Sequence, residues 1–245
     1  MIDTDLATIS HDRLTFKSPL SGTHAAELVE ALRPLDGAEV LDLGCGRGEL
    51  LRRVVAAAPT ARGTGLDTDA SAIAHAGSAV AEHGPAGRVR YVTADAAGTD
   101  ATGDVVLCVG ARHAWPSARD ALAALRERVR PGGRLLFADG FWTHPPTDAE
   151  LAGLGAEPDE LGSLADLVDL AVGAGYRLLD LSVATEREWD AFESGWCAGV
   201  EDWLWRNPGH PDAAELRRAV DAHRDGWLRG YRGVMGFAYL VLARP

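Results

Sequence analysis

The sequence predicts an α/β fold with a doubly wound, mostly parallel sheet that is covered by helices on both faces. Short apolar runs alternate with helical stretches along most of the 245 residues, which is the pattern of strand–helix–strand units. The apolar run at 105–109 is continuous, as expected for a strand that is buried on both faces. A cluster of glycines follows the first predicted strand, where such a sheet turns into a helix.

The predicted strands are apolar runs bounded by glycine, proline or aspartate. They span 37–43, 62–67, 88–93, 104–109, 134–138, 176–183 and 236–243. A turn is expected at 131–133, where Pro131 precedes two glycines. Because the strands alternate with helical stretches over most of the chain, a mostly parallel sheet is expected.

The predicted helices have local start and stop signals. The helix at 47–58 stops at Pro59, and the helix at 70–83 begins after Asp69, a plausible N-cap residue. Ser117 and Asp120 form a weak capping box ahead of another helix. The predicted helices outside the long insertion described next are 23–32, 47–58, 70–83, 117–129 and 164–174.

About 50 residues of predominantly helical pattern, 185–233, interrupt this alternation before the last predicted strand. Thr185 and Glu188 form a capping box at their start. A largely aromatic stripe follows, with the spacing of one helix face. Its members are Trp189, Phe192, Glu193, Trp196, Val200 and Trp203.

Composition limits the class of protein. Lys plus Arg number 24 and Asp plus Glu 36, so the formal net charge is −12. This balance disfavours nucleic acid or an anionic membrane as partner, because both attract clustered positive charge. No apolar run approaches the roughly 20 residues of a membrane span, and the first ten residues lack the features of a signal peptide. We therefore expect a cytoplasmic protein, and its single lysine, Lys17, indicates a GC-rich bacterial genome.

The clearest functional motif is the glycine loop after the first strand. Asp42 precedes Gly44, Gly46 and Gly48, and Glu49 opens the following helix. Glycines let the backbone turn tightly and let a ligand approach without obstruction by a Cβ atom. A dinucleotide loop has its third glycine one residue later and places a pyrophosphate at the helix N-terminus. The two acids favour a ligand with a cationic end over a pyrophosphate.

Two more acids follow later strands. Asp67 ends the second strand, where a carboxylate accepts hydrogen bonds from both hydroxyls of a ribose; otherwise it or Asp69 caps the next helix. Asp95 follows the third strand and is either an acceptor for an amine or a surface turn residue. Because ligands of such sheets bind at the carboxyl ends of the strands, these acids are expected to share one crevice with the glycine loop.

In this order and spacing, the segments VLDLGCGRGEL, GLDTD, TADA, DVVLCVGARHAW and VRPGGRLLFADGFW resemble the consecutive motifs of class I S-adenosylmethionine (SAM)-dependent methyltransferases. The resemblance covers roughly 37–142 strongly and extends loosely to the final strands. It implies a Rossmann-like sheet with an antiparallel final strand and a helical insertion before it. It also implies SAM as cofactor and S-adenosylhomocysteine (SAH) as product.

The resemblance also implies cofactor roles for individual residues. Asp42 supports the loop near the sulfonium and amino group, Asp67 holds the ribose hydroxyls, and Asp95 accepts from the adenine amine. Gly110 offers its carbonyl to the methionine amine, and Cys45 fills space rather than acting as a nucleophile. The full set of implied cofactor contacts is Asp42, Gly44, Cys45, Gly46, Gly48, Asp67, Thr68, Asp95, Ala96, Gly110 and Trp115.

The methyl acceptor is expected beside the end of the fourth strand. His113 lies there, either as a general base or as a residue that packs over the cofactor or orients the substrate. Trp115 and Trp142 end adjacent loops and either wall the pocket or belong to the core. Methyltransferases of DNA bases and glutamine amides share an Asn/Asp-Pro-Pro-aromatic signature after this strand. Its absence here further disfavours nucleic acid as substrate.

In this family, insertions of this kind commonly cover the substrate site. Glu193 and Trp196 are therefore expected to face the substrate, with Glu193 recognising a polar or cationic group; the alternative is an edge carboxylate paired with an arginine. On the next helix, His223 is expected to be a packing histidine. Phe16 in the segment 14–20 is a candidate contact of a lid over the site, unless the N-terminal helix simply packs on the sheet.

Together these expectations describe one domain, 1–245. It comprises an N-terminal helical lid (1–36), a SAM-binding core (37–184), a Trp-rich substrate-side insertion (185–233) and a final strand (234–245). The expected activity is methyl transfer from SAM to an O, N, S or C nucleophile of a small molecule. The alternatives are a SAM-binding protein that does not transfer methyl groups, a protein or tRNA methyltransferase, and a nicotinamide-dependent oxidoreductase. No metal-ligand spacing is visible, and the three cysteines form no CxxC pair.

Overall fold

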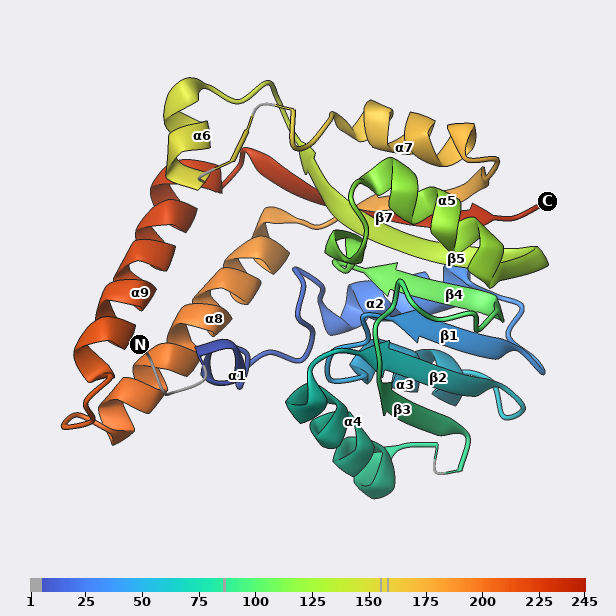
Figure 1. The fold of residues 1–245 in the computed structure, drawn as a ribbon, viewed down its shortest axis with the longest axis horizontal. Helices are drawn as coiled ribbons and strands as arrows, with labels where there is room; N and C mark the ends of the chain where they lie inside the picture. The colour runs from blue at the N-terminus through green and yellow to red at the C-terminus, as the bar shows by residue number, and fades with distance from the viewer. Residues whose placement is uncertain (1–5, 86, 155, 158) are drawn as a thin grey trace.

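A seven-stranded sheet forms the centre of the computed structural model, which describes residues 6–245 except 86, 155 and 158 (Figure 1). Its strand order is β3-β2-β1-β4-β5-β7-β6. Neighbours from β3 to β5 are parallel, whereas β7 is antiparallel to both β5 and β6. This confirms the predicted sheet and its antiparallel final strand. The strands are β1 (Glu39–Leu43), β2 (Arg62–Asp67), β3 (Val89–Thr93), β4 (Gly103–Val109), β5 (Val129–Trp142), β6 (Arg177–Val183) and β7 (Met235–Ala243).

Helices cover both faces of the sheet (Figure 1). Residues of α2 and α3 belong to one buried cluster, and residues of α5 and α7 belong to another. Val40 of β1 lies in the first cluster and Leu41 in the second, because successive strand residues point to opposite faces. The helices are α1 (Leu6–Ser10), α2 (Gly22–Ala31), α3 (Glu49–Ala56), α4 (Ala70–His83), the 3₁₀ turn η1 (Arg112–Ala114), α5 (Ala118–Arg128), α6 (Asp148–Leu154), α7 (Leu164–Gly173), α8 (Glu186–Arg206), α9 (Ala213–Gly226) and the π-helical turn η2 (Trp227–Tyr231). Within the described ranges, none of these helices combines the length and apolar character needed to cross a membrane.

Predicted helix boundaries hold where a cap residue marks them. Asp69 accepts from the amides of Ser71 and Ala72 at the start of α4, and Ser117 accepts from the amide of Asp120 at the start of α5. The helices α1 and α6 and the turn η1 escaped prediction. They contain five, seven and three residues, which is too short for a helical period to appear in the sequence.

Strand β5 is longer than predicted. The turn expected at 131–133 lies within β5, and the strand continues past the predicted end at 138 to Trp142. The extension has a tertiary cause, because residues from Arg134 to Trp142 all pair with β7. Pairing with a strand about 100 residues later cannot be read from a local pattern.

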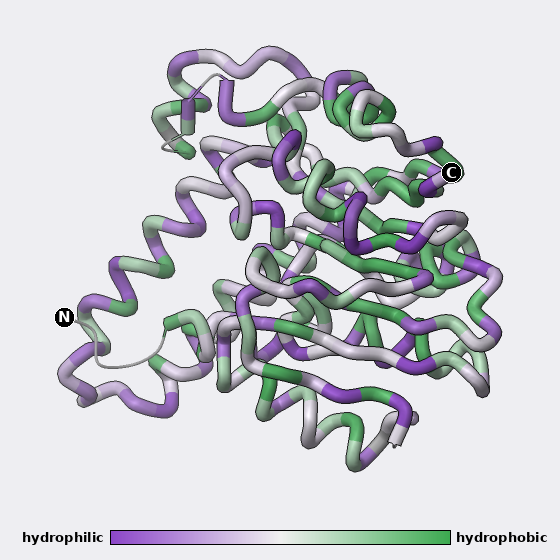
Figure 2. Tube along the Cα trace, turned by 45° about the vertical axis from the view of Figure 1, so that its right-hand side comes forward, coloured by the Kyte–Doolittle hydropathy of each residue, from purple (hydrophilic) through white to green (hydrophobic). Residues whose placement is uncertain are grey.

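The insertion forms a helical hairpin that projects from the carboxyl edge of the sheet (Figure 1). Figure 2 shows hydrophobic residues concentrated in the strands and alternating with polar ones along the projecting helices. The helix α1 lies against α8, where a Cβ at Gly199 would overlap the Ile9 carbonyl. The N-terminal segment and the insertion therefore meet at the same edge of the sheet. Their shared buried contacts are formed by Val200, Leu204, Leu216 and Val220, with Leu6 and Ile9 packed against them.

Glu188 in the first turn of α8 joins the N-terminal segment to this hairpin. One carboxylate oxygen accepts from the Ser21 amide at 2.9 Å and lies 3.1 Å from His24 Nδ1. The other accepts from the amide of Thr185 at 2.8 Å and from its hydroxyl at 3.0 Å, which confirms the predicted capping box. Partial burial opposes ionisation, but the hydrogen bonds from Thr185 and Ser21 prevail and lower the pKa of Glu188 to about 2.

Replacing Glu188 by alanine is expected to lower the free energy of unfolding at neutral pH by about 2 kcal/mol, because the Ser21 amide loses its acceptor and α8 loses its capping box. The pKa of the folded carboxyl lies below its ordinary value of 4.5, so its contribution is present above that value and is lost as the pH falls toward 2. Urea unfolding at about pH 7 and about pH 3 measures both effects. Glu201→Ala, at an exposed position on the same helix, is the control. An equal loss at both pH values would contradict this account.

Candidate functional site

The glycine loop joins β1 to α3 at the carboxyl edge of the sheet. Gly44, Gly46 and Gly48 have φ values of 80°, 52° and 75°, which residues with a Cβ atom rarely adopt. A Cβ at Gly44 would overlap the Cβ of Ala111, and a Cβ at Gly48 would overlap the ring of Tyr91. Both conformation and packing therefore require glycine at the first and last of these positions.

The Asp67 carboxylate holds this loop against the end of β2. Its Oδ2 accepts from the Gly46 amide at 2.7 Å, and its Oδ1 accepts from the Asp69 amide at 2.9 Å. The Leu66 carbonyl accepts from the Gly44 amide at 2.9 Å. Because an ionised carboxylate offers about four lone-pair sites, Asp67 keeps acceptor capacity for a ligand after binding the loop.

A cavity of about 440 Å³ lies along this edge, between the strand ends and the segment that follows α1. Of the predicted substrate-side residues, Phe16 and His113 line it. Trp115, Trp142, Glu193 and Trp196 are not among its lining residues. The structure thus brings most of the predicted site together. The predicted cofactor contacts that line the cavity are Asp42, Gly44, Cys45, Gly46, Gly48, Asp67, Thr68, Asp95, Ala96 and Gly110.

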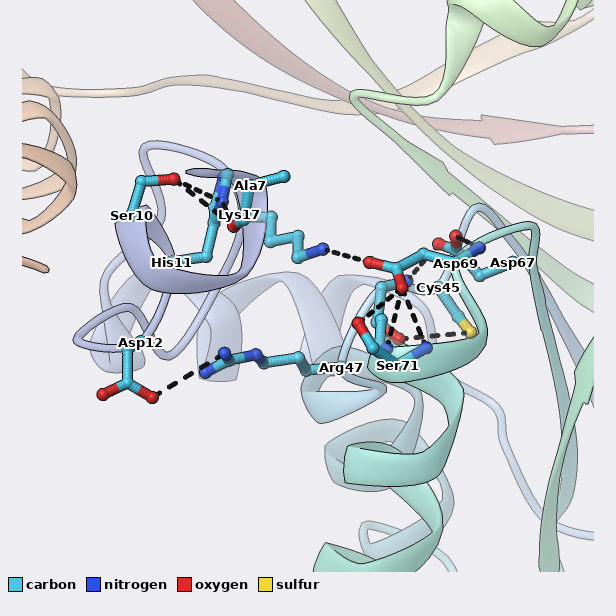
Figure 3. A network of polar contacts seen from close by, with 12 residues as sticks. Ala7, Ser10, His11, Asp12, Lys17, Cys45, Arg47, Asp67, Asp69 and Ser71 are labelled. Carbon is cyan, nitrogen blue, oxygen red and sulfur yellow. Dashed lines mark hydrogen bonds and ion pairs between the residues drawn. The ribbon is translucent and has the colours of Figure 1, made fainter. Parts of the chain in front are cut away.

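The N-terminal segment is attached to the rim of the cavity by ion pairs (Figure 3). Lys17 Nζ lies 3.3 Å from Asp69 Oδ2, and the Arg47 guanidinium lies 3.9 Å from the Asp12 carboxylate. A hydrogen bond from the Ser71 hydroxyl, together with helix amides and Lys17, lowers the pKa of Asp69 to about 2. The Asp69 carboxylate is therefore ionised at neutral pH, and its contact with Lys17 connects this segment to α4.

Asp42 contributes a buried carboxyl to the cavity wall. Asp42 is 4% exposed. In the described part of the chain, no residue forms a hydrogen bond or an ion pair with its carboxyl group. Burial, reinforced by the nearby charge of Asp67, raises the pKa of Asp42 to about 8. This environment favours a cationic ligand, whose charge would stabilise the ionised form. Burial also raises the pKa of the Cys45 thiol, so Cys45 stays protonated and is not an activated nucleophile.

Replacing Asp42 by asparagine is expected to remove a pH dependence from the stability of the ligand-free protein. Between about pH 4 and pH 8 the carboxyl is ionised in the unfolded chain and protonated in the folded one, so stability falls as the pH rises through this window. The variant should gain stability relative to the unmodified protein between about pH 5 and about pH 8, measured by urea unfolding. Asp36→Asn, at an exposed position before β1, is the control. If the free energies of unfolding of the variant and the unmodified protein changed with pH in the same way, Asp42 would not be buried as a neutral acid.

Two predicted aromatic residues pack away from the cavity. Trp115 is partly buried against the cluster that includes Ala121 of α5. Trp142 is 6% exposed and packs with Leu151 and Val234 at the end of β5. Trp142 ends β5 and Trp115 follows η1, both at the carboxyl edge of the sheet, but Trp115 packs against the cluster that includes α5 and Trp142 packs against Leu151 and Val234.

Glu193 and Trp196 belong to the contact between α8 and α9. The Glu193 carboxylate lies 2.6 Å from His223 Nε2, and the rings of Trp196 and His223 stack with centroids 3.7 Å apart. Burial, together with the nearby carboxylate of Glu193, raises the pKa of Tyr231. The expectation of an arginine partner for Glu193 is therefore wrong, whereas His223 is the packing histidine that was predicted. Helical spacing identifies which residues share a face, but not which element that face meets.

The site also contains residues that sequence patterns did not single out. His11, directly after α1, lines the cavity, and the Tyr91 hydroxyl donates to the Gly48 carbonyl at 2.8 Å below the loop. Next to His113, Arg112 pairs with the buried Asp139 at 3.0 Å. Burial raises the pKa of Asp139, with Arg112 acting in the opposite direction. The position of Asp139 directly after the predicted fifth strand was a usable signal, because the other acids of the site also follow strands.

Comparisons with known proteins agree with this geometry. Residues 40–133 match a family model described as a methyltransferase domain. The uncharacterized protein YjhP of Escherichia coli is 30% identical over 240 residues, which cover 96% of each chain. A crystal structure of a SAM-dependent methyltransferase from Geobacter sulfurreducens in complex with SAH covers 100% of both chains, with a TM-score of 0.91 at 27% identity. The O-methyltransferase cnsE of Penicillium expansum is 31% identical over 183 residues, which cover 73% of this chain and 62% of that protein.

Proposed function

Because the chain belongs to the class I SAM-dependent methyltransferases, we propose that it transfers a methyl group from SAM to an O, N, S or C nucleophile of a small molecule. The observation that carries the proposal is the buried carboxyl of Asp42 in a cavity that also contains Asp67 and Asp95. SAM has a cationic sulfonium and amino group, a ribose diol and an adenine amine. Acids at the ends of three neighbouring strands match these groups in chemistry.

The residues of this cavity fit the cofactor group by group. Asp42 would hold the cationic end, and Asp67 has acceptor capacity for the ribose hydroxyls. Asp95 accepts from the Ala97 amide at 3.0 Å through Oδ1, which leaves Oδ2 for the adenine amine. When bound, SAM supplies a methyl group that its sulfonium activates for displacement. The protein's contribution is alignment of the two reactants, which can be worth an effective molarity of about 10⁵–10⁸ M.

We assign to His113 the role of general base, which removes the proton from the methyl acceptor. It lies on η1 directly after β4 and lines the cavity together with Gly110. The pair formed by Arg112 and Asp139 holds this turn against β5. A hydroxyl acceptor benefits from such a base by about 10²–10⁴-fold, whereas an amine or a thiolate needs none.

With a hydroxyl acceptor, His113→Ala is expected to lower kcat by about 100-fold or more at neutral pH, because the proton acceptor is lost. SAH affinity should stay within about twofold of the unmodified protein, since the assigned cofactor contacts remain. Transfer from labelled SAM measures the first quantity and calorimetric titration measures the second. His75→Ala, at an exposed position on α4, is the matched control. An unchanged kcat would remove His113 from proton transfer.

Two observations support a small molecule as substrate. The net charge of −12 disfavours docking to a polyanion such as tRNA or DNA. The relative cnsE is named an O-methyltransferase, and its match spans 73% of this chain. A protein or tRNA methyltransferase would instead need an extended docking surface of complementary charge.

Thermal unfolding with SAH, SAM or NAD tests the cofactor and precedes any substrate screen. A ligand at 100 times its Kd adds about 2.7 kcal/mol to native stability, which corresponds to roughly 5–10 °C for a chain of this size. We expect SAH and SAM, but not NAD, to raise the unfolding temperature. Small nucleophiles are then screened with labelled SAM. A shift with NAD alone would overturn the proposal in favour of an oxidoreductase. Binding of SAM without a methylated product among O, N, S and C nucleophiles would favour a SAM-binding protein that does not transfer methyl groups.

A further inference from the structure

Strand β6 forms one edge of the sheet and carries half of the exposed large apolar side chains. The strand order places β6 at one end of the sheet and β3 at the other. Eight large apolar side chains are exposed in the described ranges, and four of them lie within the seven residues of β6. They are Leu178, Leu179, Leu181 and Val183, with exposed fractions from 37% to 49%. Exposed apolar residues of a monomer are normally scattered singly, so this cluster indicates a surface that meets another chain.

Three of these side chains lie on the same face of the sheet. Leu178, Leu181 and Val183 each pair with a β7 residue that belongs to the buried cluster beneath α7. Cross-strand partners point to the same side of a sheet, so the three side chains lie on the side of α7. Val172 of α7, a helix that contacts β6, is 48% exposed on this part of the molecule. The open edge therefore has a continuous apolar strip along one face.

The backbone of this edge offers hydrogen-bonding groups to a further strand. The Ala184 amide donates to the Phe237 carbonyl of β7 at 2.9 Å. Backbone groups of successive strand residues point alternately to the two sides, so those of Leu181 and Val183 point away from β7. In the described part of the chain, no strand lies on that side of β6. Edge strands are commonly protected by lysine or proline, and β6 contains neither.

The end of β6 is held in place from inside the molecule. Ser182 Oγ lies 2.7 Å from His24 Nε2, and His24 Nδ1 lies 3.1 Å from the Glu188 carboxylate. Because an ionised carboxylate only accepts, Nδ1 donates to Glu188 and Nε2 accepts from the Ser182 hydroxyl. These bonds connect β6 to α2 and α8. A strand fixed in this way loses little conformational freedom when it pairs.

A second copy of β6 fits this edge better than an unrelated strand, because the strand is complementary to itself. When two copies run antiparallel about a two-fold axis at Leu181, the two Leu181 residues lie opposite each other. Val183 of each copy then lies opposite Leu178 of the other. The outward amide and carbonyl of Leu181 pair with the same groups of the second copy, and each apolar strip covers the other. Such a contact uses the same patch on both copies, as a two-fold interface requires.

Charge also favours a second copy at this edge. The charged residues of β6 are Arg177 and Asp180, whose charges cancel, whereas the whole chain carries −12. Two copies therefore repel less through β6 than through a surface of average charge. Neither Arg177 nor Asp180 has an ion-pair partner among the described residues. In the antiparallel arrangement Arg177 lies opposite Ala184 of the second copy, two residues before the acidic Glu186 that begins α8.

From these observations we propose that the protein forms a two-fold symmetric dimer in which the β6 edges of two copies pair antiparallel and join the two sheets into one. The interface covers Leu178, Leu181 and Val183 of both copies. None of the β6 residues lines the cofactor cavity, so each copy keeps its own site. The dimer does not depend on the proposed methyl transfer.

Sedimentation velocity of the full chain at micromolar concentration tests the dimer, which is expected to have twice the mass of one chain. Leu181→Asp places two carboxylates against each other at the axis and should raise the Kd of the dimer at least about 100-fold, because an interface opposes facing like charges. Val92→Asp makes the same kind of change at a 40% exposed position on β3, the opposite edge, and should stay dimeric. Far-UV circular dichroism verifies that both variants are folded.

Leu181→Cys tests the position of the axis. Hydrogen-bonded antiparallel partners have Cα atoms about 5.5 Å apart, which lies within the range of a disulfide. Mild oxidation should therefore link two copies of this variant covalently. It should not link Val92→Cys or the unmodified protein, whose cysteines are Cys45, Cys108 and Cys197.

Hydrogen exchange of the unmodified protein gives an answer even if Leu181→Asp does not fold. The amides of Leu181 and Val183 should exchange more slowly as the protein concentration rises, because pairing removes them from water. A monomer at micromolar concentration, a dimer that persists in folded Leu181→Asp, or exchange of these amides that is independent of concentration would each overturn the inference.

Discussion

An Asp67→Ala variant is expected to bind SAH at least about 100-fold more weakly than the unmodified protein. Each hydrogen bond from a ribose hydroxyl to an ionised carboxylate is worth about 1.5–3 kcal/mol, and two of them correspond to a factor of about 100 or more in Kd. The same carboxylate accepts from the Gly46 amide at 2.7 Å, so the variant also loosens the loop that faces the ligand. Isothermal titration with SAH measures the effect.

The controls separate ligand binding from loop support. Asp67→Asn keeps an oxygen acceptor for Gly46 and should fall between the alanine variant and the unmodified protein. Asp36→Asn changes an exposed carboxylate ahead of β1, at the other edge of the sheet, and should bind SAH normally. If Asp67→Ala kept its affinity within about threefold, Asp67 would not be the ribose ligand.

Gly44→Ala should lower the free energy of unfolding by about 2–5 kcal/mol. Gly44 has a φ of +80°, and a left-handed conformation costs a residue with a Cβ atom about 1–2 kcal/mol. The new Cβ would also overlap the Cβ of Ala111, and overpacking of this kind costs about 1–3 kcal/mol more. Urea unfolding at neutral pH, with the slope checked for two-state behaviour, measures the sum.

Two further variants divide this loss into its parts. Gly132 has a φ of +79°, but a Cβ added there would meet no atom within 4 Å, so Gly132→Ala should show the conformational cost alone. In the double variant Gly44→Ala with Ala111→Gly, the overlapping atom is gone and the packing cost should be recovered. A double-mutant cycle with no coupling between 44 and 111 would contradict the overlap.

The sequence predicted the parts of this protein that depend on local signals. The glycine loop at 44–48 and the caps Asp69, Ser117 and Thr185 are each decided by residues a few positions apart. The caps complete their hydrogen bonds within three residues, and the glycines permit the left-handed backbone of the loop wherever its partners come from, which is why the structure agrees with the pattern. The loop's hydrogen bonds to Leu66 and Asp67 come from the next strand. The mostly parallel sheet followed from the alternation of strands and helices, because parallel neighbours require crossover connections.

The sequence was less informative where distant elements meet. Glu193 was expected near the substrate, but its partner His223 lies 30 residues later on α9. Trp142 was expected in the pocket wall or in the core, and the long pairing of β5 with β7 carries it into a separate cluster. In each case the pattern identified an apolar face and the residues on it. The surface opposite that face is decided by tertiary packing, which a single sequence does not display.

The position of β7 has a consequence for the order in which the molecule can assemble. This strand lies between β5 and β6, although it comes after both of them in the chain. Its Tyr239 hydroxyl also donates to the Pro19 carbonyl at 3.0 Å, so it buttresses the N-terminal segment beside the cofactor cavity. During translation, β6 therefore has no neighbour to pair with, and the segment at Pro19 lacks its support, until the final strand emerges from the ribosome. The nascent chain thus completes its ligand site only after this strand is made, so ligand capture follows the synthesis of β7.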